Sequence, residues 1–127
     1  MDGGARGNPG PAGYGALIRT RDGMILRELR GYLGTTTNNV AEYNGLIAAL
    51  RYARSVGASS VRVYADSELM VRQMRGEYRV KAPGLRPLYE EARRLSSSLG
   101  RFEILHIPRE ENRAADRLAN MAMDEGA

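Results

Sequence analysis

The first third of the chain alternates apolar and polar residues with the period of two that is typical of β-strands. Residues 14–20 (YGALIRT) and 24–33 (MILRELRGYL) follow this pattern, and the Asp22-Gly23 step between them predicts a hairpin turn. We expect a further strand at Asp2, ahead of a glycine-rich loop. The pattern therefore predicts an antiparallel meander of three strands.

After the polar segment TTTNN the apolar period lengthens to three or four residues, which predicts a helix over 40–56 that stops at Gly57. A strand over 60–65 (SVRVYA) ends at Asp66. The rest of the chain predicts helices over about 67–75 and 88–99, a strand over 101–107 and a helix over about 113–123. A meander followed by crossovers implies an α/β fold, with a mixed five-stranded sheet of three antiparallel and two parallel strands flanked by helices.

Composition narrows the class of protein. The chain has 127 residues, 43% hydrophobic and 27% charged, and no repeat or linker divides it, so we expect one domain over 1–127. It has neither an apolar run of about 20 residues nor the apolar stretch of a signal peptide, which predicts a cytoplasmic protein that does not enter a membrane. The absence of cysteine excludes disulfides and thiolate metal sites. A monomer is the default expectation.

The basic balance of the chain favours a polyanionic partner. The net charge is +4, and Lys81 is the single lysine among nineteen basic residues, so the rest are arginines suited to phosphate. A genome rich in G and C would also produce this arginine usage, and the sequence leaves both explanations open.

Four acidic residues fall at the ends of predicted elements: Asp2, Glu42, Asp66 and Asp116. Each has an ordinary structural explanation. Asp2 could be a solvated terminal residue, Asp66 could cap the next helix and Asp116 could complement its helix dipole, while Glu42 stands three residues after Asn39, as in a capping box. All four together at one edge of a sheet would repel one another. Such a cluster needs a multivalent cation, and oxygen ligands suit Mg²⁺ or Mn²⁺.

Four motifs carry a resemblance to a known family. DGGARGNPGPAGYGA, TNNVAEYNGLIAAL, YADSELMVRQM and REENRAADRLA occur in the order of the type 1 ribonuclease H family, and they cover essentially the whole chain. The chain is most similar to the short bacterial and archaeal branch, which includes the ribonuclease H domain of actinobacterial fusions with a phosphatase. The resemblance implies a ribonuclease H-like fold and an endonuclease that cuts the RNA strand of RNA/DNA hybrids with two Mg²⁺ or Mn²⁺ ions, leaving 3′-OH and 5′-phosphate ends.

The resemblance also implies roles for individual residues. The family's catalytic, metal-binding carboxylates are matched by Asp2, Glu42, Asp66 and Asp116. The resemblance implies that Asp2 and Asp66 bind both ions and that Asp116 is the most weakly bound ligand. Glu42 is expected on the side of the attacking water, within reach of the ribose 2′-OH. The residues that match nucleic-acid contacts are Gly3, Asn8, Thr37, Asn38, Asn39 and Arg109. Asn39 could instead cap its helix and Asn8 could simply precede Pro9 in a turn. Double-stranded RNA is a further candidate substrate.

The sequence departs from the family pattern in three places. Only Met1 precedes Asp2, so we expect a truncated first strand that exposes neighbouring strand edges and loosens Asp2. GEYRVKAPGLRPLY replaces a basic helix and loop, with scattered positive charges at Arg75, Arg79, Lys81 and Arg86 that are equally well explained by solvation. The family's loop histidine is missing. His106 lies in a predicted strand, where we expect a structural role, and Arg109 is the cation expected near Asp116.

Two other functions deserve comparison with the nuclease. A binding module that keeps the fold without catalysis would be expected to lose a carboxylate, and all four are present. A junction resolvase or integrase core would lack the GNPG loop and the NNVAE step, and both are present.

Overall fold

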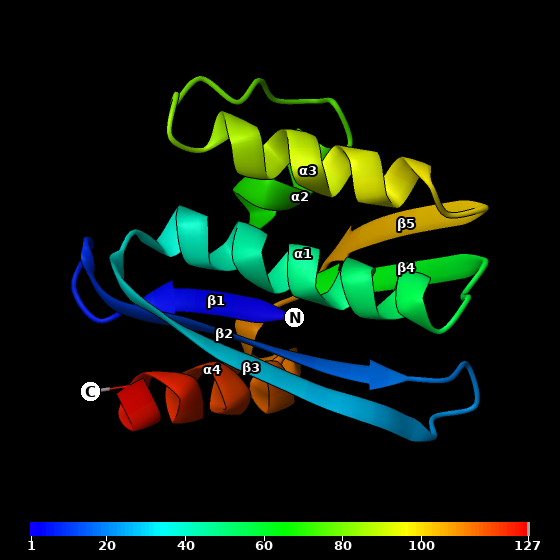
Figure 1. Cartoon of the computed structure of the whole chain (residues 1–127), viewed down its shortest axis with the longest axis horizontal. Coiled ribbons are helices and arrows are strands. Elements are labelled where there is room, and N and C mark those ends of the chain that lie inside the picture. Colours follow the sequence, from blue (N-terminus) through cyan, green and yellow to red (C-terminus); the bar gives the residue numbers. More distant parts are fainter. Residues whose placement is uncertain (127) are drawn as a thin grey trace.

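The computed structural model describes residues 1–126 and has the predicted order of strands and helices (Figure 1). The strands are β1 (Asp2–Ala5), β2 (Gly10–Arg19), β3 (Ile25–Thr36), β4 (Ser60–Ala65) and β5 (Arg101–His106). The helices are α1 (Asn38–Ser55), α2 (Glu68–Met74), α3 (Arg86–Ser97), a 3-10 turn η1 (Arg109–Glu111) and α4 (Arg113–Gly126). No helix within residues 1–126 has the length and apolar character needed to cross a membrane.

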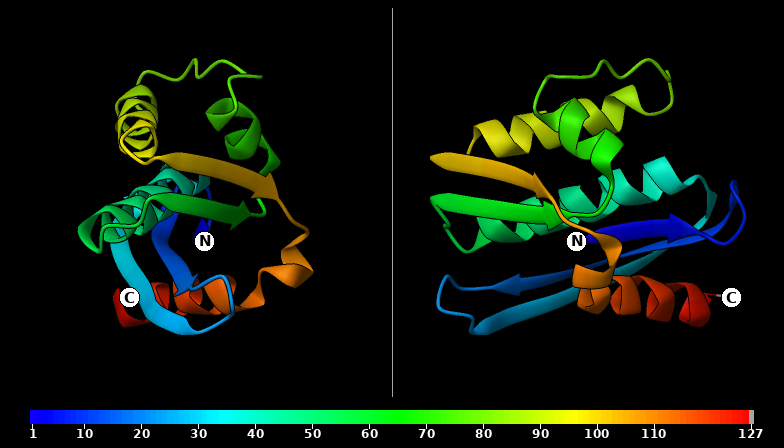
Figure 2. Two further views of the ribbon diagram at one scale, coloured as in Figure 1. Left: turned by 90° about the vertical axis from the view of Figure 1, so that its right-hand side faces the viewer. Right: turned by 180° about the vertical axis from the view of Figure 1, so that it is seen from behind.

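The α/β fold class is confirmed, with the five strands hydrogen-bonded as two groups. β1, β2 and β3 form an antiparallel sheet, while β4 and β5 pair in parallel. Helices α1 and α4 lie on opposite sides of the antiparallel sheet, and α3 lies beside α1 (Figures 1 and 2). The fully buried side chains Tyr43, Leu46, Leu50, Met70 and Val71 lie on α1 and α2, at the centre of the core.

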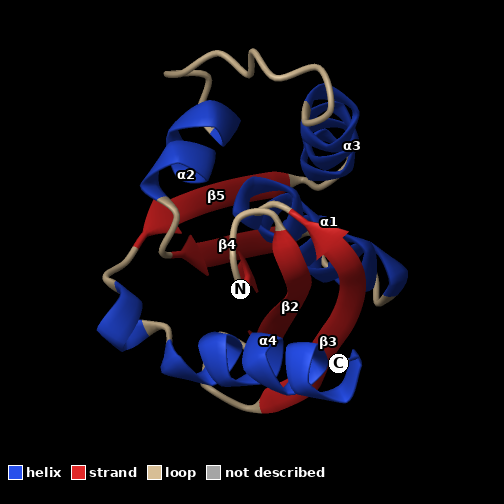
Figure 3. Cartoon of the chain, turned by 90° about the vertical axis from the view of Figure 1, so that its left-hand side faces the viewer, coloured by secondary structure: helices blue, strands red, loops and turns tan. Residues whose placement is uncertain are grey.

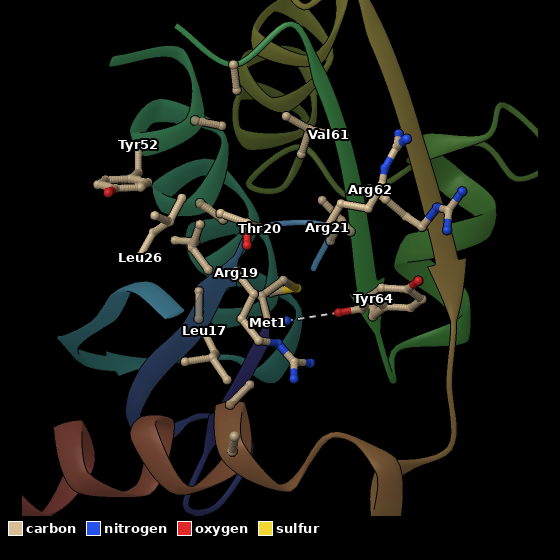
Figure 4. Close-up of a pocket in the computed structure, with 18 of the residues that line it drawn as sticks. Met1, Leu17, Arg19, Thr20, Arg21, Leu26, Tyr52, Val61, Arg62 and Tyr64 are labelled. Atoms are coloured by element: carbon tan, nitrogen blue, oxygen red, sulfur yellow. Dashed lines mark hydrogen bonds between the residues drawn. The ribbon is translucent and has the colours of Figure 1, made fainter. Parts of the chain in front are cut away.

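A short first strand explains the division between the two groups. β1 pairs with residues 12–15 of β2, but β2 continues to Arg19. The amino group of Met1 donates a hydrogen bond to the Tyr64 carbonyl of β4 (2.9 Å; Figure 4). Beyond Met1, a groove of about 610 Å³ opens between β2 and β4. Within residues 1–126, this short strand thus leaves two facing strand edges unpaired, as the sequence led us to expect.

The start of α1 corrects three predictions. The helix begins at Asn38, two residues before the expected start, because Thr37 has extended backbone angles and its hydroxyl accepts a hydrogen bond from Val40 N. Asn39 is therefore inside the helix and is not its cap. Glu42 consequently lies in the second helical turn instead of the first.

Other helix and strand boundaries differ from the predicted ones by a few residues. β3 runs on through Thr36 instead of ending at residue 33, and α3 begins two residues early, at Arg86. The cap of α2 is Ser67, whose hydroxyl accepts from Met70 N, so Asp66 does not serve as the cap. The glycine-rich opening also contributes to strand structure, because Gly10–Arg19 is one continuous strand.

Candidate active site

The four predicted carboxylates come from four different elements and are all half-buried. Asp2 opens β1, Asp66 directly follows β4, Asp116 lies in the first turn of α4 and Glu42 lies in α1. Figure 3 shows these elements meeting around the start of the chain, with β4 and α4 on either side of the N-terminus. The carboxyl end of β4 and the N-terminal end of α4 therefore both present an acid near β1.

Asp2 is the carboxylate at which the others meet. The pKa of Asp2 is raised to about 8, mainly by burial and in addition by the charge of Asp66 and a hydrogen bond with Asp116. A backbone hydrogen bond at Gly3 opposes this rise. The structure thus brings Asp66 and Asp116 close enough to Asp2 to change its pKa.

Glu42 joins the group from the side of Asp66. Burial raises its pKa to about 7, a hydrogen bond with the Ser67 side chain opposes that rise, and the charge of Asp66 adds to it. Asp66 therefore lies near both Asp2 and Glu42, and Asp116 lies near Asp2. Within residues 1–126, no three acidic or histidine side chains are arranged as a ready-made cage around one ion.

The donor set fits a hard divalent cation. All four groups offer carboxylate oxygens, which are the ligands that Mg²⁺ and Mn²⁺ prefer. Their mutual repulsion in a half-buried place is relieved by a positive ion. His106 is exposed at the end of β5, so the structural role expected for it has no support in core packing.

Gly3 holds α1 close to β1. A methyl group at Gly3 would overlap the backbone of Ala41 and come within 2.5 Å of Glu42 N. Only glycine permits this approach, which sets the distance between the helix that carries Glu42 and the strand that carries Asp2. Gly3, predicted as a nucleic-acid contact, therefore has a packing role in the fold.

Two of the predicted nucleic-acid contacts, Asn8 and Asn38, also hold the end of β1 and the loop after it against the start of α1. The Asn8 side-chain oxygen accepts from Asn38 N (3.0 Å), and the Asn38 side-chain oxygen accepts from Ala5 N (2.7 Å). Thr37 caps the helix. Asn8, Thr37 and Asn39 are exposed, so they can still be reached by a ligand.

Arg109 lies where the sequence suggested. It is in η1, with its guanidinium 3.6 Å from an Asp116 carboxylate oxygen and its side chain 78% exposed. The other predicted positive charges divide into two groups. Arg75 donates to the Ile104 carbonyl and Arg86 pairs with Glu90, whereas Arg79 and Lys81 are exposed.

Two residues near the carboxylates were missed by sequence reasoning. Ser67 donates to Glu42, and Asn112 lies buried at the start of α4. Ser67 directly follows Asp66 in YADSELMVRQM, and Asn112 stands four residues before Asp116 in REENRAADRLA. Both residues were missed because their hydrogen-bond partners, Glu42 and Met1, lie far away in the sequence.

Comparisons with known proteins match the whole chain. A family model described as reverse transcriptase-like matches residues 1–122. The chain is 51% identical over 127 residues to a bifunctional protein of Mycobacterium tuberculosis, covering 99% of this chain. The solved N-terminal ribonuclease H domain of that protein has a TM-score of 0.95, with 98% of this chain and 90% of that chain covered.

Two further proteins agree with this match. The chain is 41% identical over 125 residues to ribonuclease HI of Halobacterium salinarum, whose crystal structure has a TM-score of 0.93 and covers 98% of this chain and 94% of that one. LC11-RNase H1, solved in complex with an RNA/DNA hybrid, is 45% identical, with a TM-score of 0.92 and the same coverage. The chain spans 35% of the Mycobacterium protein and 63% of the Halobacterium protein.

Proposed function

The chain belongs to the ribonuclease H family, and from this we propose that it is an endonuclease that hydrolyses the RNA strand of RNA/DNA hybrids. The observation that carries the proposal is the convergence of acids from β1, β4 and α4 at Asp2, with Glu42 beside Asp66. The complex of LC11-RNase H1 with a hybrid supports the choice of substrate. We also propose that the protein acts as a cytoplasmic monomer.

The proposed mechanism assigns each carboxylate a part in holding two divalent ions. Bound Mg²⁺ or Mn²⁺ would supply an activated water and a counter-charge for the leaving 3′-oxygen, giving 3′-OH and 5′-phosphate ends. Asp2 and Asp66 would hold both ions. Glu42 would lie beside the attacking water and accept from the ribose 2′-OH, and Asp116 would be the weakest ligand.

The proposed binding surface is the start of α1 and the loop before β2. A hybrid duplex presents its 2′-OH groups in a wide, shallow minor groove, where polar side chains can reach them. Asn38 and Asn39 would read that groove. Asn8, Thr37 and Arg109 would contact sugar or phosphate. In support of this, Asn8 and Thr37 both accept hydrogen bonds from the first turn of α1, the helix that carries Glu42. Double-stranded RNA has a similar groove and is a further candidate substrate.

Cleavage of a hybrid labelled on either strand tests this proposal. We expect the wild-type chain to cut the RNA strand in Mg²⁺ or Mn²⁺, to leave the DNA strand intact and to stop in EDTA. Asp66→Asn should lower the rate at least about 100-fold, because it removes a carboxylate shared by both ions. Asp124→Asn is the matched control, because Asp124 pairs with Arg6 on the surface.

Duplex DNA and duplex RNA serve as the comparison substrates in this experiment. Cutting of duplex RNA would extend the substrate range without changing the mechanism. A folded wild-type chain that binds hybrid but leaves it intact in either metal would contradict the proposal and favour a binding module.

A further inference from the structure

Three hydrogen bonds join the backbone segments that carry three of the four carboxylates. The Met1 amino group donates to Tyr64 O at the end of β4 (2.9 Å). The Asn112 side-chain amide donates to Met1 O (2.8 Å), and Asp116 N donates to Asn112 O (3.1 Å). The connection therefore passes from β4 through the start of β1 to the first turn of α4.

Asn112 is the single side chain in this connection, and it is buried. It is 7% exposed, and its amide spans 111 positions in sequence to reach Met1. Its own N–H donates to the carbonyl of Arg109, the first residue of η1 (2.9 Å). A buried amide is costly unless it is hydrogen-bonded, and here the backbone N–H, the backbone carbonyl and the side-chain amide all have partners.

We propose that Asn112 is a positioning residue for the carboxylate site. Its side chain fixes the peptide unit that precedes Asp2, and its carbonyl fixes the first turn of α4, which carries Asp116. It thereby sets the separation at which Asp2 and Asp116 act together on a divalent cation. The inference rests on the proposed function and names a residue that acts through these two carboxylates without touching substrate.

If Asn112 only stabilised the fold, its loss would lower stability without changing metal affinity. Three variants separate that role from positioning. Asn112→Ser keeps a residue that favours a helix start but shortens the side chain, which takes its donor out of reach of Met1 O. Asn120→Ser is the matched control: its amide donates to Asp116 O within α4 (3.0 Å), and its side-chain oxygen accepts from the exposed Arg6 (3.4 Å), so it takes no part in the connection through Met1. Leu95→Ala removes a buried side chain of α3 and lowers stability far from the carboxylates.

The test combines Mn²⁺ calorimetry on the full chain, without nucleic acid, with steady-state cleavage of hybrid. Melting curves first set a temperature at which every variant is folded. We expect Asn112→Ser to weaken Mn²⁺ binding about tenfold and to lower kcat about tenfold, with the KM for hybrid within about twofold of wild type. Asn120→Ser and Leu95→Ala should keep wild-type Mn²⁺ affinity.

The outcomes separate the inference from the proposed function. Wild-type Mn²⁺ affinity in Asn112→Ser, with a lowered melting temperature like that of Leu95→Ala, would overturn the inference alone. A wild-type chain that neither binds Mn²⁺ nor cuts hybrid would overturn both.

Discussion

At the scale of single residues, the surroundings of Asp2 explain why an acidic residue stands directly before a glycine-rich segment. Its carboxylate is half-buried beside Asp66 and Asp116, and burial is the main reason that its pKa rises to about 8. Gly3, the next residue, brings α1 against β1 and so places Glu42 near the same group. The Asp-Gly step therefore combines a proposed metal ligand with the close packing that surrounds it.

The raised pKa predicts that Asp2→Asn stabilises the chain in EDTA at alkaline pH. A carboxyl whose folded pKa (about 8) exceeds its ordinary value of 3.8 supports folding below 3.8 and loses that contribution as pH rises through 8. At pH 9 the asparagine should raise the free energy of unfolding by at least about 1 kcal/mol, or Tm by roughly 3–6 °C. The difference should vanish at pH 4.

Thermal melts from pH 4 to 9 in EDTA measure this effect, with Asp124→Asn as the surface control. An Asp2→Asn chain that is no more stable than wild type at pH 9 would show that the carboxyl is not crowded by its neighbours.

At the scale of elements, glycine determines how closely α4 packs on β2. A methyl group at Gly15 would come within 2.5 Å of both Ala115 O and the Leu118 side chain, and within 2.6 Å of Ala119 N. Two of these three contacts are with backbone atoms, which cannot move without shifting the helix. Because α4 carries Asp116, this contact also affects the carboxylate site.

Gly15→Ala should therefore destabilise the fold by about 1–3 kcal/mol, the usual cost of overpacking a close contact. Urea unfolding measures the change. Gly84→Ala is the matched control, because no neighbour of Gly84 lies within 4 Å of an added methyl group. Equal stability of the two variants would mean that α4 adjusts freely on the sheet.

The elements differ in how well the local sequence predicts them. The strand over 60–65 and the element order follow from local periodicity, which the sequence records directly. The start of α1 was misplaced because Asn8 and Thr37 fix it through hydrogen bonds to the helix start. Asn112 was missed because its partner, Met1, is 111 positions away. Long-range hydrogen bonds leave no periodic signal.

At the scale of the whole molecule, the chain consists of two hydrogen-bonded sheets connected at Met1. The residues after Gly15 in β2 and the residues before Tyr64 in β4 face a groove, and their backbone groups on that side have no strand to pair with (Figure 4). The Met1 amino group is buried between them, and burial lowers its pKa.

An extension that continues β1 should therefore stabilise the molecule. We predict that TVTIV placed before Met1 pairs with both strand edges, converts the buried amino group into an amide and raises stability by about 1–3 kcal/mol. Amide hydrogen exchange should slow along residues 16–19 and 60–63. The control extension TPTPV cannot pair in this way. Equal melting temperatures for the two extensions would contradict this description of the groove.

We propose that carboxylates from β1, α1, β4 and α4 form one divalent-cation site. The most direct test is a heteronuclear NMR spectrum of the full chain with substoichiometric Mn²⁺, whose paramagnetism broadens signals of nearby amides. We predict that the amides of Gly3, Glu42, Ser67 and Asp116 broaden together, before those around the surface pair of Arg6 and Asp124. Broadening confined to one of these elements, or strongest at the surface pair, would show that the four acids do not form a single site.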